Sequence, residues 1–211
     1  MKNALNVNDC KDMIRFVADK IIESKPYLTE VDSAIGDGDH GIGMAGGMQK
    51  AKEKIDAMDP TEDAYRVFDT AGKAMLMSMG GASGVIFGSM YIAGAKNSPP
   101  KSELDAADIA KMFQKSLAAI KERGHASVGD KTMVDALEPA AIAMSEHSEE
   151  GLLEMLKAAE QAAHDGMEST KDMLAKYGRA KSLMERAIGF QDPGATSVWI
   201  IIRSMREFVE N

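Results

Sequence analysis

Apolar residues recur at three- and four-residue steps through most of the chain, which is the spacing of one face of an α-helix. In the first such stretch Met13, Val17 and Ile21 share a stripe, and Asn8 is a candidate N-cap. The pattern predicts further helices over residues 43–55, 61–79, 83–95, 105–123, 132–145 and 148–177, and after Asp192-Pro193-Gly194. Ser83, Asp105 and Ser148 are the candidate N-caps of three of these helices.

Residues 198–202 are apolar on every side, so periodicity alone fits either a buried helix or a strand. No other segment has the pattern of a partner strand, and we therefore predict a helix. No internal repeat, low-complexity run or linker divides the chain. The expected fold is all-α, with residues 1–211 forming a single domain whose short connections favour antiparallel neighbours.

The unusual residues lie in every second connection between the predicted helices. Segments 26–42, 80–84, 124–131 and 178–194 follow the first, third, fifth and seventh helices, whereas the other connections hold ordinary turn residues. In an up-and-down arrangement, alternate connections lie at the same end of the bundle. The sequence therefore predicts that these four segments meet at one rim.

Charge and composition exclude several classes of function. The chain has 25 Lys and Arg residues against 33 Asp and Glu, a net charge of -8, and no basic tract, so nucleic acid is not an expected partner. No apolar stretch is long enough to cross a bilayer, and the first residues lack the apolar core of a signal sequence. Cys10 is the single cysteine, so we expect an inert helix thiol and a cytoplasmic location.

Three carboxylates, Asp32, Asp37 and Asp39, lie within eight positions, with glycines beside them. Glycine lets the backbone turn tightly enough for these acids to converge, and carboxylates this close repel one another unless a cation lies between them. Oxygen ligands suit Mg²⁺ or Ca²⁺. The spacing is not that of an EF-hand, which needs a glutamate where this chain has Gly43. We therefore predict a metal site.

The other three segments offer groups that bind anions. Residues 80–84, Gly-Gly-Ala-Ser-Gly, form either an anion site at a helix N-terminus or a place of close helix packing. Residues 124–132 depart from a P-loop, because an Asp precedes Lys131 and no strand comes before them. Lys131 is either a phosphate contact or the ion-pair partner of Asp130 or another rim acid. Arg179 is either a solvated surface residue or a phosphate ligand.

An acid cluster that holds metal, glycine-rich helix starts and an arginine together favour one ligand, a nucleotide bound with Mg²⁺. His40 follows the acids directly. It is either a nucleophile or base, or a side chain that only forms hydrogen bonds.

These segments together resemble the L subunit of dihydroxyacetone kinases and the equivalent nucleotide domain of the fused kinases. The matching residues are DSAIGDGDHG from Asp32, GGASG from Gly80, GDKTM from Gly129, and the pattern of GR, ER and QDPGA between Gly178 and Ala195. The resemblance implies an eight-helix antiparallel up-and-down barrel with a nucleotide at one rim. It implies a phosphotransferase subunit that delivers phosphate from Mg-ATP, or from recharged ADP, to a keto-sugar held by a separate K subunit.

The resemblance also implies the site residues. Asp32, Asp37 and Asp39 would bind two Mg²⁺ ions. The nucleotide, ADP or ATP, would contact His40, Gly41, Ile42, Gly43, Ala82, Ser83, Gly124, Met133, Arg179, Asp192, Pro193 and Gly194. No catalytic side chain is predicted, because in this family a histidine of the K subunit holds the sugar.

The expected partners are a K subunit and a phosphotransferase-system protein that donates phosphate, with a homodimer left open and no membrane. Gly43, Lys181-Ser182 and Phe190 depart from the family pattern, which more often has Asn, Ser-Tyr and His there. The phosphoryl donor and the sugar, dihydroxyacetone or a tetrulose, therefore stay open. A regulatory module that reports its ADP or ATP state to a partner is the alternative function. Sugar phosphorylation in the presence of a K subunit separates the two.

Overall fold

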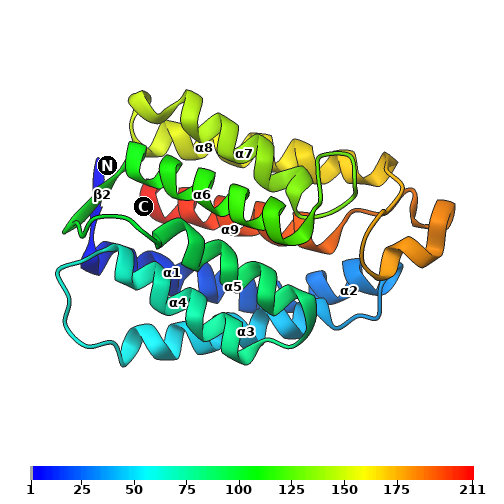
Figure 1. The fold of residues 1–211 in the computed structure, drawn as a ribbon, viewed down its shortest axis with the longest axis horizontal. Helices are drawn as coiled ribbons and strands as arrows, with labels where there is room; N and C mark the ends of the chain where they lie inside the picture. The colour runs from blue at the N-terminus through cyan, green and yellow to red at the C-terminus, as the bar shows by residue number, and fades with distance from the viewer. Residues whose placement is uncertain (1) are drawn as a thin grey trace.

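The computed structural model describes residues 2–211, which are almost entirely helical (Figure 1). Within these residues the α-helices are α1 (Val7–Glu23), α2 (Lys25–Ile35), α3 (His40–Asp56), α4 (Tyr65–Ser78), α5 (Gly81–Ala95), α6 (Ala106–Gly124), α7 (Val134–Glu146), α8 (Leu152–Ser169) and α9 (Pro193–Glu210). The 3-10 helices η1 (Ser148–Glu150), η2 (Thr170–Asp172) and η3 (Arg179–Ala187) and the strands β1 (Ala4–Asn6) and β2 (Glu103–Asp105) complete the fold. The all-α prediction is confirmed.

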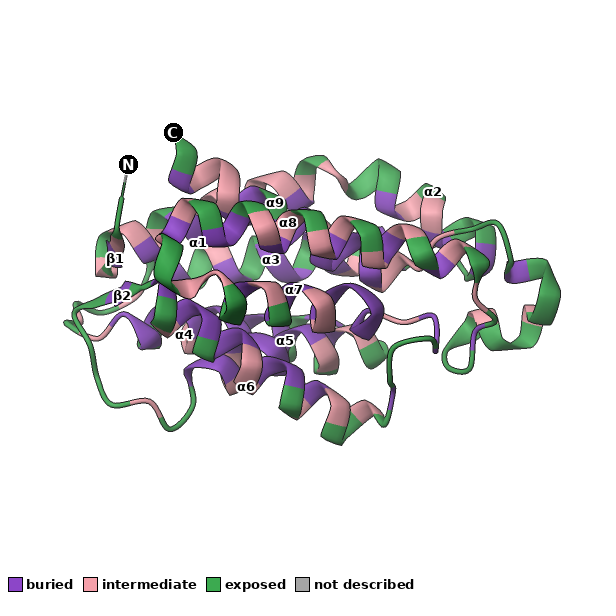
Figure 2. Ribbon diagram, turned by 90° about the horizontal axis from the view of Figure 1, so that it is seen from above, coloured by how far each residue is buried: buried purple, intermediate pink, exposed green. Residues whose placement is uncertain are grey.

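Eight of the helices form a closed ring of neighbours. Helix α1 packs on α3, contacts then follow the chain order from α3 to α9, and α9 packs back on α1. Buried side chains gather on the inner faces, while the outer faces are exposed (Figure 2). Methionines such as Met44, Met75 and Met155 are fully buried there, where their flexible side chains fill irregular gaps between helices.

Two helix starts form as the sequence predicts. The Asp105 carboxylate accepts the Asp108 N–H at 2.9 Å, and the Asp108 carboxylate accepts the Asp105 N–H at 3.3 Å, which is a capping box before α6. The Asp192 carboxylate accepts the Ala195 N–H at 2.7 Å and caps α9. Residues 198–202 lie inside α9, so their assignment to a helix is confirmed.

Three predicted caps are wrong. Helix α1 begins earlier than predicted because Asn6, rather than Asn8, accepts the N–H groups at its start. Ser83 lies inside α5, which begins after Gly80. Ser148 lies in η1, and α8 begins only after Gly151, whose φ of 91° suits glycine. Other boundaries also differ from the prediction: α3 begins at His40, α4 at Tyr65 and α7 at Val134, and α8 ends at Ser169.

Helix α2 and the two strands are additional to the predicted elements. Pro26 lies in the first turn of α2, where its missing N–H costs nothing, so the segment expected to be a loop from residue 26 is helical to Ile35. Strands β1 and β2 pair antiparallel with Leu5 opposite Leu104, and both side chains are buried. The strands lie at the end of the ring that holds both termini, whereas α2 and η3 lie at the opposite end (Figure 1).

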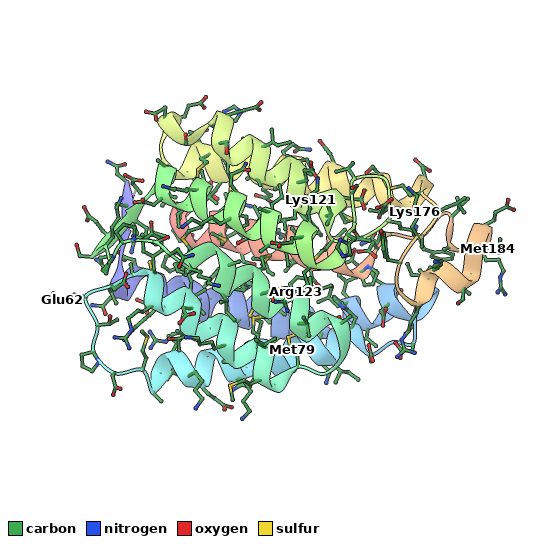
Figure 3. All side chains as sticks on the ribbon, viewed as in Figure 1. Glu62, Met79, Lys121, Arg123, Lys176 and Met184 are labelled. Carbon is green, nitrogen blue, oxygen red and sulfur yellow. The ribbon has the colours of Figure 1, made fainter. Side chains whose placement is uncertain are left out.

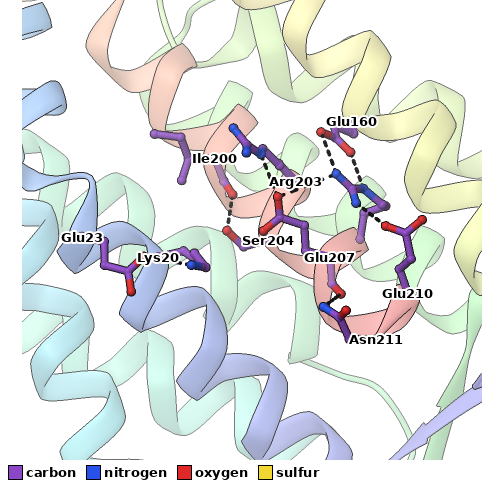
Figure 4. A network of polar contacts seen from close by, with 10 residues as sticks. Lys20, Glu23, Glu160, Ile200, Arg203, Ser204, Glu207, Glu210 and Asn211 are labelled. Carbon is purple, nitrogen blue, oxygen red and sulfur yellow. Dashed lines mark hydrogen bonds and ion pairs between the residues drawn. The ribbon is translucent and has the colours of Figure 1, made fainter.

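Ion pairs on the outside of the ring form both between neighbouring helices and within one helix. Arg206 of α9 contacts Glu160 of α8 at 2.7 Å, and Arg203 contacts Glu207 one turn along at 2.9 Å (Figure 4). Pairs that remain in contact with solvent contribute little individually, typically about 0–1 kcal/mol. No helix within residues 2–211 combines the length and the apolar character needed to span a bilayer.

Candidate functional site

A cavity of about 480 Å³ opens at the end of the ring that carries α2 and η3. Its volume lies in the range of small-molecule sites, roughly 300–1,000 Å³. All four segments that the sequence singles out contribute to its wall. The predicted site residues that line it are Asp32, Asp37, Asp39, His40, Ala82, Ser83, Gly124, Met133, Arg179, Asp192, Pro193 and Gly194.

Gly41, Ile42 and Gly43 follow His40 in the first turn of α3 but do not line this cavity. Gly41 is buried against α2, where an added Cβ would overlap the Lys25 carbonyl oxygen. The Ile42 side chain is exposed. The Gly43 N–H donates to the Asp39 carbonyl oxygen at 2.9 Å within the first turn of the helix.

The three aspartates converge where the chain turns from α2 into α3. Each offers a carboxylate oxygen, and these oxygens lie within 4.8 Å of one another. Asp32 is on the last turn of α2, and its carboxylate accepts the His40 N–H at 3.2 Å across the loop. The Gly36 N–H donates to the Asp32 carbonyl oxygen at 2.6 Å, and a Cβ at Gly36 would collide with the Asp32 carboxylate. The glycine therefore permits the close approach.

The charges of this cluster are only partly compensated. Arg179 reaches Asp37 from η3, with 2.6 Å between guanidinium nitrogen and carboxylate oxygen. Burial, followed by the charges of Asp37 and Asp32, raises the pKa of Asp39. Three carboxylates thus face one guanidinium, and an all-oxygen donor set with excess negative charge fits Mg²⁺.

His40 is fixed through both ring nitrogens. It is 6% exposed, its Nε2 lies 2.7 Å from the Ser197 hydroxyl of α9, and its Nδ1 lies 3.5 Å from the Ser83 hydroxyl of α5. Burial lowers the pKa of the imidazole. A neutral ring held between two hydroxyls favours the hydrogen-bonding alternative over a nucleophile.

The glycine-rich start of α5 packs closely through some of its glycines and leaves its first N–H groups without a side-chain cap in the described part of the chain. Gly80 to Ser83 line the cavity, and within the described residues no side chain caps this helix. Its first N–H groups are therefore suited to an anion. Gly84 and Gly88 serve packing instead, because added Cβ atoms would overlap the Met79 carbonyl oxygen and lie 2.8 Å from Leu76, respectively.

Lys131 does not form the ion pair considered for it with Asp130 or another acid among the described residues. It is 2% exposed, and its ammonium donates to the carbonyl oxygens of Thr170 and Phe190 at 2.6 and 2.5 Å. Asp130 pairs with Lys176 at 2.6 Å instead. Asp192 caps α9, and burial of its carboxyl raises the pKa of that group to about 7.

The cavity also has an apolar wall that the sequence analysis missed. The side chains that form it come from five elements or connections, and they are Ile35, Ile86, Phe87, Ile120, Val134 and Tyr177. Phe87 lies one helical turn after Ser83, so both side chains are on the same face of α5. Its place in the cavity could have been predicted from the glycine-rich segment 80–84. An apolar wall beside acids and the start of a helix suits a ligand with both an apolar and an anionic part.

The DAK2 domain model matches residues 34–207. The chain belongs to the DAK2 domain family. The DAK2 relatives that match most of it confirm the resemblance. The ADP-binding subunit DhaL of the PEP-dependent dihydroxyacetone kinase of Escherichia coli (strain K12) is 38% identical over 181 residues, which cover 85% of this chain and 86% of that protein. A PEP-dependent counterpart in Listeria innocua, from kinase 2, is 35% identical over 189 residues, covering 89% and 88%.

A solved structure shows the same fold. The dihydroxyacetone kinase of C. freundii superimposes with a TM-score of 0.73 at 24% identity, over 94% of this chain and 34% of that chain. A second structure of that kinase, in complex with AMP-PNP and Mg²⁺, superimposes with a TM-score of 0.72 over 93% and 33%.

Proposed function

We propose that this chain is the ADP-binding, phosphoryl-transferring subunit of a dihydroxyacetone (glycerone) kinase, an enzyme that phosphorylates an alcohol group. One observation carries the proposal. The oxygens of Asp32, Asp37 and Asp39 converge at the same cavity as the uncapped, glycine-rich start of α5. The ring of eight helices would then act as one nucleotide-binding domain, an antiparallel up-and-down barrel with its ligand at one rim.

The aspartates are the residues that would hold magnesium, and their number and arrangement allow two ions. When bound, Mg²⁺ would neutralise charge on the phosphates of ADP or ATP. The N–H groups at the start of α5 and the Ser83 hydroxyl would orient those phosphates, and Arg179 would approach them from η3. The apolar wall around Phe87 would receive the base and keep water from that side of the cavity.

Partner proteins would hold the acceptor sugar and supply the phosphoryl group. The described residues around the cavity are assigned to the metal, to the phosphates or to the base of the nucleotide. No separate pocket with its own general base is left among them for a sugar. We therefore propose that a K subunit brings the keto-sugar to this rim. Relatives named PEP-dependent and PTS-dependent favour a phosphotransferase-system donor that recharges bound ADP.

Calorimetry with Mg-ADP tests the site directly. Asp37→Asn should abolish magnesium-dependent binding while helix content stays unchanged, because it removes one charge from the cluster. Asp19→Asn is the matched control, since Asp19 pairs with Lys52 on the ring surface, away from the cavity. Unchanged affinity of Asp37→Asn for Mg-ADP would show that these carboxylates do not hold the metal.

A further inference from the structure

The segment between η2 and α9 leaves the ring of helices and returns to it through a narrow neck. It carries Arg179 and one side of the cavity, and its outer turns near Met184 project from the molecule (Figure 3). The two sides of the neck are joined where the Gly189 N–H donates to the Lys171 carbonyl oxygen at 2.7 Å. The Asp192 N–H donates to the Thr170 hydroxyl at 2.9 Å.

Lys131 joins the same two sides from beneath. One ammonium donates to the carbonyl oxygen of Thr170 on the outgoing side and of Phe190 on the returning side. No carboxylate within the described residues lies within 4.0 Å of this ammonium, so it is not half of an ion pair. Burying an ammonium without a carboxylate partner costs free energy, which its two hydrogen bonds to backbone carbonyl groups must offset.

The loop that presents Lys131 is itself rigidly held. Lys131 has a φ of 58°, a left-handed conformation that is strained for a residue with a side chain. Asp135, which is 1% exposed, accepts the N–H groups of Gly129 and Thr132 at 2.6 and 2.7 Å on either side of it. The Tyr177 hydroxyl donates to the His125 carbonyl oxygen at 2.8 Å, so the loop also contacts the segment directly beside Arg179.

We propose that Lys131 is a positioning residue, whose ammonium clamps the neck of segment 171–190 and so holds Arg179 at the cavity. Lys131 lines the cavity through a side chain that is already engaged by two carbonyl groups. It acts on a ligand through the position of Arg179. The clamp is inferred from contacts within this chain alone. Its effect on nucleotide affinity rests on the proposed function.

Hydrogen exchange followed by mass spectrometry tests the clamp on the full chain without nucleotide. In Lys131→Met, peptides covering residues 171–192 should exchange at least about tenfold faster. The carbonyl oxygens of Thr170 and Phe190 lose their shared donor, so the neck opens more often and exposes the Gly189 and Asp192 N–H groups. Peptides from α4 should not change. Lys171→Met is the matched control, since that ammonium lies at the same neck but binds Glu168 at 2.7 Å. It should exchange as the parent chain does.

Unchanged exchange of residues 171–192 in Lys131→Met would overturn the clamp. Exchange that accelerates equally in every helix would also overturn it, because Lys131 would then stabilise the whole fold. Lys131→Gln is the second variant if Lys131→Met does not fold. It keeps a hydrogen-bond donor but removes the charge and shortens the side chain, so it should give the same local change. Loss of folding in both variants would contradict the proposal.

Calorimetry supplies a second readout. Lys131→Met should bind Mg-ADP at least about tenfold more weakly, and Lys171→Met should bind it as the parent chain does. Local loosening with unchanged affinity would overturn the link to Arg179. Local loosening in a chain that never binds Mg-ADP would leave the clamp standing and reject the proposed function.

Discussion

Asp32, Asp37 and Asp39 come from one short motif but have different surroundings. Asp32 is buried and accepts a backbone N–H, Asp37 pairs with Arg179, and burial raises the pKa of Asp39. Their spacing was enough to predict that they converge. The approach of Arg179 depends on the path of segment 171–190, which no local pattern encodes.

The buried thiol of Cys10 gives a prediction at the residue scale. Cys10 is fully buried in α1, and burial raises the pKa of its thiol from 9.0 to about 12. Between these values the folded chain keeps a proton that the unfolded chain releases, so the free energy of unfolding should fall as pH rises above about 9. Cys10→Ala should lack this pH-dependent loss in denaturant titrations between pH 8 and pH 10.

Alkylation rates check the same thiol independently. The native chain at pH 9 should react with iodoacetamide on the order of a hundredfold more slowly than the unfolded chain, because only the thiolate reacts. Equal rates in both states would show that Cys10 is accessible and that its pKa is not raised.

Lys131 shows where reasoning from residue types alone fails. A lysine in a glycine-containing loop at a rim fits a phosphate contact or an ion pair, and both were considered. Its carbonyl partners, Thr170 and Phe190, are far along the chain and carry no side-chain signal for this contact. Backbone acceptors are present at every residue, so a pattern of side chains cannot identify which of them a buried ammonium will use.

At the scale of elements, helices with strong local signals were predicted well. The capping box before α6 and the Asp-Pro-Gly sequence before α9 determine where those helices begin. Helix α2 was missed because it is short and has a proline in its first turn, a residue that also fits a loop. Each strand has only three residues, and the pairing of β1 with β2 joins segments distant in sequence, so it depends on tertiary contacts.

The packing of α8 on α7 gives a prediction at this scale. An added Cβ at Gly166 would overlap the Asp135 carbonyl oxygen. Gly166→Ala should therefore destabilise the fold by about 1–3 kcal/mol, the usual cost of overpacking, despite the better helix propensity of alanine. Urea unfolding of the two chains measures the difference.

Gly46 offers a matched control for that substitution. It lies inside α3, and no atom lies within 4 Å of an added Cβ. Gly46→Ala should stabilise the fold by roughly 0.5–1 kcal/mol through helix propensity alone. Stabilisation of similar size by both substitutions would contradict the close contact between α7 and α8.

At the scale of the whole molecule, the loop-parity argument predicted that the four segments share one rim. Eight helices were expected, and α2 is additional to them. The prediction survives because α2 does not cross the bundle. It packs against α3, α9 and η3 and remains at the cavity end.

A ligand that bridges this rim should stabilise all four segments together. Mg-ADP at about one hundred times its dissociation constant should raise the free energy of unfolding by roughly 2.7 kcal/mol. In hydrogen exchange, protection should rise together in residues 36–42, 80–86, 124–133 and 176–194, and not at the pairing of β1 with β2. Protection confined to one segment would contradict a shared site.

Division of labour between subunits is the central claim, and a coupled assay measures it most directly. The reaction contains purified chain, Mg-ATP and dihydroxyacetone, with and without a K subunit, and a parallel reaction in which bound ADP is recharged by a phosphotransferase-system donor. The rim must bring the phosphoryl group within about 3–3.5 Å of a hydroxyl that another protein holds. We expect no useful turnover by the chain alone and sugar phosphorylation once the K subunit is added, with at least one of the two donors. Rapid turnover without a K subunit would contradict the account, as would a failure of both donors to support phosphorylation in its presence.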